Sequence, residues 1–181
     1  MTLISSPAKA WEEIRLVEDK RKVHTDFVYP MIGLCALSVF LGSLFTHGWG
    51  GPQSFQIAMT ECCVVAVSLF AGYFLAAYAV NEVSVQMFDM PNNMPAAQQF
   101  AGYSLVVTFL VYIVSGILPA FAFIGIILQF YIIYIVWEGA PILMDVKEDV
   151  RLKYTIIVSV LLILCPVIIQ FTFKKLLFFF N

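Results

Sequence analysis

The chain has 181 residues, of which 61% are hydrophobic and only 12% are charged, whereas a soluble domain carries about 25% charged residues. A soluble fold could not bury that much apolar surface, so the composition excludes one. The formal net charge of −2 is too small to indicate a class of partner.

The charged residues are distributed unevenly and leave long gaps. No residue ionised at neutral pH lies between Asp26 and Glu61, Glu61 and Glu82, Asp89 and Glu138, or Lys153 and Lys174. Each gap is long enough for a membrane span of roughly 20 residues. The sequence therefore predicts an all-α polytopic membrane protein.

Residues 1–28 are expected to form a cytosolic amphipathic helix and the lead-in to the first span. Ser6 and Pro7 are typical of the N-cap and the first position of a helix, and Trp11, Ile14 and Val17 then recur on one face. Two arrangements fit this pattern: a helix that lies on the membrane surface, and an ordinary helix packed on the cytosolic ends of the spans.

A five-span membrane domain is expected over residues 29–175, followed by an external tail over 176–181. The charge-free run after Asp89 is too long for one span, and Pro119 divides it into two helices. Polar residues and prolines indicate a loop over residues 81–99. The predicted transmembrane helices cover residues 29–46, 60–80, 101–118, 121–137 and 154–173.

The second predicted span has a flat face of small residues. Ser68, Gly72 and Ala76 recur there at every fourth position, which lets another helix approach closely. That helix belongs either to the same chain or to a second copy of it, in which case the protein is a homo-oligomer.

The distribution of lysine and arginine predicts the orientation in the membrane. These residues cluster before the first span and between the fourth and fifth spans, at Lys9, Arg15, Lys20, Arg21, Lys22, Lys147, Arg151 and Lys153. The opposite side has only Lys174 and Lys175. Because positive charge favours the cytosolic side, the N-terminus is predicted to be cytosolic and the C-terminus external.

With this topology, polar residues from four spans meet at the cytosolic membrane face. This predicted cytosolic rim consists of Asp26, Tyr29, Pro30, Asn81, Glu82, Gly102, Tyr103, Ser104 and Glu138. Tyrosine and carboxylates also favour helix ends at membrane interfaces for purely structural reasons. We expect Glu138, which lies close to the hydrocarbon, to be paired with a group from another span or from the N-terminal helix. The external side offers only His47, Trp49 and Glu61, from separate positions.

Two short motifs in this span pattern resemble the Ypt/Rab-interacting protein (YIP) family. DFVYP at residues 26–30 precedes the first span, where Asp26 and Pro30 match a D-L-x-G-P-like motif and Tyr29 replaces its glycine. GYSL at residues 102–105 opens the third span and matches completely. The segment SPAKAWEEI looks more like prokaryotic members, which implies a location in the plasma (inner) membrane. The resemblance implies a five-span protein without known catalytic activity; its eukaryotic relatives contact prenylated Rab GTPases, a role that we do not transfer.

The residues bear on three classes of function. The first is a membrane adaptor or organiser, which binds membrane lipids and an unidentified cytosolic or membrane protein at the cytosolic rim. The alternative is a small transporter or channel, including one that handles lipids. The deepest polar side chains are Gln129 and Gln170, and Glu61 lies about one turn into the second span, near the outer face. An enzyme is not expected, because no hydrolase, phosphate-binding or metal-ligand motif is found. No cofactor, metal or nucleic-acid partner is expected.

Overall fold

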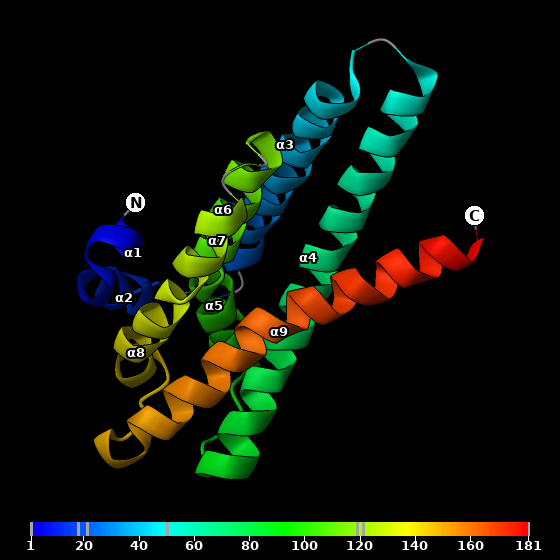
Figure 1. The fold of residues 1–181 in the computed structure, drawn as a ribbon. Helices are drawn as coiled ribbons and strands as arrows, with labels where there is room; N and C mark the ends of the chain where they lie inside the picture. The colour runs from blue at the N-terminus through cyan, green and yellow to red at the C-terminus, as the bar shows by residue number, and fades with distance from the viewer. Residues whose placement is uncertain are drawn as a thin grey trace.

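The structure is a computed structural model that describes residues 2–17, 19–20, 22–49, 51–118, 120 and 122–180. Its regular elements within these ranges are helices (Figure 1). They are α1 (Thr2–Ser5), α2 (Pro7–Arg15), the π-helix η1 (His24–Val28), α3 (Tyr29–His47), α4 (Pro52–Phe88), α5 (Met94–Ser104), α6 (Val106–Ile117), α7 (Ala122–Gln129), α8 (Tyr131–Leu143) and α9 (Glu148–Phe180).

Five helical stretches of the described residues are long and apolar enough to cross a membrane. They cover His24–His47, Pro52–Phe88, Met94–Ile117, Phe123–Leu143 and Glu148–Leu176. Three of them join consecutive helices: η1 with α3, α5 with α6, and α7 with α8. The prediction of an all-α protein with five membrane spans is confirmed.

The helices extend beyond the apolar segments that predicted them. The expected loop over residues 81–99 is wrong, because α4 continues to Phe88 and α5 begins at Met94. Asp89 stops α4 instead, in a left-handed conformation with φ 51°. The expected break at Pro119 lies outside the described residues.

Helix α4 lies between α3 and α9, and α3 also packs against α6 (Figure 1). Gly72 of α4 lies against Pro166 of α9, whose Cα would be 2.7 Å from a Cβ at position 72. Gly42 of α3 lies directly against the backbone of Gly116 of α6. The other two small residues on the α4 face, Ser68 and Ala76, are fully buried. Small residues thus bring the helix backbones together within one chain, as expected when association depends on close packing.

Candidate functional site

The N-terminal helix α2 is fixed to the membrane domain by Trp11. The indole Nε1 donates a hydrogen bond to the backbone carbonyl of Ile135 at 3.0 Å, and the side chain is fully buried. Its ring packs on Phe100 of α5 with a centroid separation of 5.3 Å. Gly139 of α8 leaves the necessary space, since a Cβ there would lie 2.5 Å from Trp11 Cε2.

Three further contacts hold the N-terminal helices against the ends of the spans. Gln99 Nε2 donates to the Ile14 carbonyl at 3.2 Å, and the Tyr131 hydroxyl donates to the Ile4 carbonyl at 2.7 Å. Arg15 and Asp145 form an exposed ion pair at 3.3 Å. The geometry corresponds to the second arrangement allowed by the sequence, in which the helix packs on the spans (Figure 1).

The GYSL segment lies where α5 passes into α6. Gly102 is buried, and a Cβ there would lie 3.0 Å from a methyl group of both Val23 and Val28. Ser104 is also fully buried, and its hydroxyl has no hydrogen-bond partner within the described part of the chain. Gly102 therefore lets α5 pack closely against Val23 and Val28 at the start of the first span.

Tyr103 differs from its neighbours because it is only half-buried. Its ring meets Trp11 edge-on, with centroids 6.3 Å apart, and packs on Phe27 at 5.0 Å. Beside it lies an apolar cavity of about 300 Å³, enclosed by α1 and α2 on one side and by the first and third spans on the other. Glu13 is the charged residue in its lining.

Three residues of the DFVYP motif lie on the outside of the first span, whereas Val28 is buried. Asp26, Tyr29 and Pro30 are all exposed. Asp26 accepts a hydrogen bond from the Thr25 hydroxyl at 3.0 Å, and the Tyr29 ring stacks on Phe70 at 5.6 Å. The segment is a surface of the bundle, next to α4.

Asn81 and Glu82 make local contacts near the end of α4. The Asn81 side chain is buried and its Oδ1 accepts the backbone N–H of Asn93 at 3.2 Å, which ties α4 to the start of α5. Glu82 accepts a hydrogen bond from Gln86, one turn further along the helix, at 2.7 Å.

The expected pairing of Glu138 is wrong for the described part of the chain. Glu138 is half-buried and has no hydrogen bond or ion pair to any residue that the structure describes. The nearby cation, Arg151, is directed to the backbone carbonyl of Trp137 and to Glu148 instead. Of the predicted rim residues, the structure thus places Tyr103 against the Trp11 anchor and Glu138 directly before Gly139, which contacts the anchor, while Asp26, Tyr29, Asn81 and Glu82 make separate local contacts.

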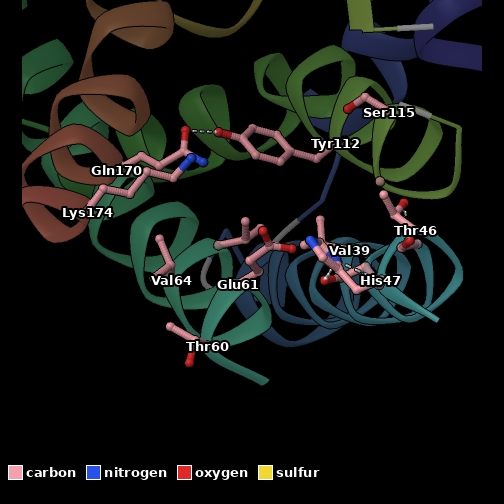
Figure 2. A pocket seen from close by; sticks show the side chains of 14 residues that line it. Val39, Thr46, His47, Thr60, Glu61, Val64, Tyr112, Ser115, Gln170 and Lys174 are labelled. Atoms are coloured by element: carbon pink, nitrogen blue, oxygen red, sulfur yellow. Dashed lines mark hydrogen bonds between the residues drawn. The ribbon is translucent and has the colours of Figure 1, made fainter. Parts of the chain in front are cut away.

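A second and larger cavity of about 580 Å³ lies at the opposite end of the spans, between α3, α4, α6 and α9. Figure 2 shows Glu61 and His47 on one side of it and Lys174 and Gln170 on another. The Tyr112 hydroxyl donates to Gln170 Oε1 at 2.9 Å across this space.

Sequence reasoning missed this cavity, because it treated His47 and Glu61 as separate external residues. The structure brings both to one lining. One signal in the sequence could have indicated the cavity. Gln170 and Lys174 are polar residues one helical turn apart on the last span, and they lie on the same helix face as Pro166. Two of the polar residues considered for transport form hydrogen bonds within the bundle. Gln129 donates to the Thr108 hydroxyl at 3.4 Å, and Gln170 accepts from Tyr112.

Comparison with known proteins gives one match. The sequence pattern of the Yip1 domain matches residues 1–169, which is nearly the whole chain. No curated protein and no solved structure matches it.

Proposed function

This chain belongs to the Yip1 family, and from that premise we propose that it is a non-enzymatic membrane adaptor that binds a partner protein on the surface formed by α2 and Tyr103. Members of the family are generally non-enzymatic membrane proteins involved in trafficking. The proposed location is the plasma (inner) membrane of a prokaryote, which rests on the resemblance of SPAKAWEEI to prokaryotic members.

The observation that carries the proposal is the burial of Trp11. A short helix that rested on lipid alone would be free to move relative to the spans, whereas α2 is held by an indole inserted between α5 and α8. Its exposed side chains, Lys9, Glu12, Glu13 and Arg15, therefore face outward in a fixed arrangement. A fixed polar surface lowers the entropic cost of binding a partner.

The charge distribution supports the same surface. Every Lys, Arg, Asp and Glu of the chain, apart from Glu61, Lys174 and Lys175, lies in segments that the predicted topology assigns to the cytosolic side. Charged residues at the rim of an interface steer association and select the partner. We therefore propose that the partner approaches from the cytosol.

The apolar cavity beside Tyr103 supplies the second element of such a surface. An interface typically has an apolar centre with a polar rim, and the cavity lies directly next to the exposed face of α2. Glu13 stands in its lining and is exposed. A partner segment that places an apolar side chain in the cavity and a basic group near Glu13 fits both features.

Site-specific photo-crosslinking in native membranes tests this function. A crosslinking residue is placed at Glu12, on the exposed face of α2, and separately at Phe171, an exposed apolar position on α9. We expect a protein adduct of discrete mass at position 12 and lipid adducts alone at position 171. The position-12 adduct should weaken strongly with Trp11→Ala, which frees α2, and less with Trp11→Phe.

A position-12 sample without a discrete protein adduct, in membranes where the protein is folded, would contradict the adaptor function. So would an adduct whose yield is the same in wild type and Trp11→Ala, because the fixed position of α2 would then be irrelevant to binding.

A further inference from the structure

We propose that the 580 Å³ cavity between α3, α4, α6 and α9 binds a glycerophospholipid whose head group carries an ammonium, such as phosphatidylethanolamine. The cavity has a size that suits small-molecule ligands, which occupy sites of about 300–1,000 Å³. It lies at the end of the spans away from α2, and the proposal does not depend on the adaptor function.

The lining changes from charged to apolar with depth along the helices. On α3 the order from the helix end inward is His47, Ser43 and Val39, and on α4 it is Glu61 followed by Val64 and Val65. A phospholipid has its chemical groups in the same order, from an ionic head group through polar ester groups to acyl chains. A water-soluble ligand would leave the valines without a matching surface.

Opposite charges enter the cavity from different helices. Glu61 belongs to α4 and Lys174 to α9 (Figure 2). Neither side chain forms an ion pair with any other residue in the described ranges. A carboxylate and an ammonium held apart in this way complement a zwitterion, with Glu61 facing the ligand's ammonium and Lys174 facing its phosphate.

Gln170 is positioned to support the phosphate contact. The hydrogen bond from Tyr112 occupies its amide oxygen. Its amide nitrogen has no partner among the residues that the structure describes, and it lies one helical turn from Lys174 in the same lining. Two donors on neighbouring turns of α9 suit the oxygens of one phosphodiester.

The surroundings favour a ligand that arrives from the bilayer. Below the cavity, Gly72 and Pro166 hold α4 and α9 in contact, and beyond this crossing the two helices diverge (Figure 1). Apolar side chains further inward along both helices, such as Val67 on α4 and Ile168 on α9, are exposed between the charged end of the cavity and the contact of Gly72 with Pro166. An acyl chain can lie along these side chains while the head group occupies the polar end.

Native mass spectrometry of the full chain in detergent provides the test, with phosphatidylethanolamine and phosphatidylglycerol of identical acyl chains as probes. Wild type should bind the ethanolamine lipid more tightly. Glu61→Gln should remove that preference, and Lys174→Gln should weaken both lipids about tenfold. The matched controls are Lys175→Gln, whose ammonium lies over the Phe171 ring, and Asp149→Asn at the other end of α9, and neither should change binding.

Three outcomes would overturn the proposal. An unchanged preference in Glu61→Gln would remove the ammonium contact. Equal weakening by Lys174→Gln and Lys175→Gln would reduce the effect to general surface charge. Full competition by soluble glycerophosphoethanolamine would show that the acyl chains contribute nothing, so that the site takes a water-soluble zwitterion. Circular dichroism of each variant confirms that the fold is retained before binding is compared.

Discussion

Arg151 donates two hydrogen bonds to the backbone carbonyl of Trp137, from Nε at 3.1 Å and from Nη2 at 2.9 Å. The carbonyl needs this partner because Pro141, four residues later in α8, has no N–H to donate. The guanidinium also lies over the Trp137 ring, 4.2 Å from its centroid. One side chain of α9 thus supplies the hydrogen bonds that α8 lacks.

Arg151→Ala should lower the free energy of unfolding in detergent by about 1–3 kcal/mol, because it leaves a partly buried carbonyl unpaired. Chemical denaturation followed by circular dichroism measures this loss. Lys153→Ala is the matched control, since Lys153 is exposed two residues further along the same helix, and it should change stability by less than about 0.5 kcal/mol. Equal losses in the two variants would show that the carbonyl contact contributes no stability.

Pro141→Ala should rescue much of the Arg151→Ala loss, because alanine restores an N–H that can bond the Trp137 carbonyl within α8. The double-mutant cycle measures the coupling directly, and we expect an interaction free energy of about 1 kcal/mol or more. Additive losses would contradict the assignment of Arg151 as a substitute donor.

Trp11→Ala should detach α2 while the spans remain folded. Loss of a buried tryptophan costs about 3–5 kcal/mol, which exceeds what the Gln99 hydrogen bond and the exposed Arg15–Asp145 ion pair supply. Hydrogen exchange should therefore become fast over Pro7–Arg15 and stay slow in α4. Trp11→Phe keeps a ring that can pack on Phe100 but loses the hydrogen bond to Ile135 and the pyrrole ring that lies over Gly139, so its effect should be smaller, about 1–3 kcal/mol. Protection of α2 in Trp11→Ala equal to wild type would disprove the anchor.

Gly116→Ala should destabilise the bundle, because the new Cβ would lie 2.9 Å from the backbone nitrogen of Val39 and α3 would have to move away from α6. Overpacking of this kind costs about 1–3 kcal/mol. Gly33→Ala on α3 is the control, since nothing lies within 4 Å of its Cβ position. There, alanine should stabilise the helix by about 0.5–1 kcal/mol. Thermal unfolding of both variants in the same detergent checks the two signs together.

Asp89→Gly should raise stability by about 0.5–1 kcal/mol. Asp89 ends α4 with φ 51°, and its N–H and that of Met90 both bond the Ser84 carbonyl. Glycine adopts this left-handed conformation without steric cost. Asp149→Gly, in the first turn of α9, should lower stability by a similar amount because glycine is a poor helix former. A loss in Asp89→Gly would show that the carboxylate itself stabilises the turn.

The sequence predicted the elements better than their contacts, and α2 shows why. Local helix rules apply to Ser6, Pro7 and the spacing of Trp11 and Ile14, so the helix and its apolar face could be predicted from the sequence. The fit of the indole over Gly139 depends on how α8 packs against α5. This packing involves residues far apart in the chain, so local sequence patterns do not predict it. The prediction that Glu138 is paired was wrong for the same reason: the nearby cation, Arg151, bonds the Trp137 carbonyl and Glu148 instead.

The error at residues 81–99 has a different cause. Hydropathy marks where the hydrocarbon ends, whereas a helix ends where its backbone hydrogen bonds stop. Asn81 and Glu82 are polar but helical, and the stop comes only at Asp89. The 580 Å³ cavity could not be predicted either, because its shape depends on the contact of Gly72 with Pro166, beyond which α4 and α9 diverge.

Helix α4 has 37 residues, which at 1.5 Å per residue makes a rod about 55 Å long. A hydrocarbon core about 30 Å thick takes up only about 39 Å of it even at a tilt of about 40°. At least about ten residues must therefore stand outside the hydrocarbon, and both ends of α4, Pro52 to Thr60 and Asn81 to Phe88, carry polar side chains that suit this position. The protein thus carries a rigid rod into the head-group layer, and a molecule that approaches along α4 meets protein before it meets lipid.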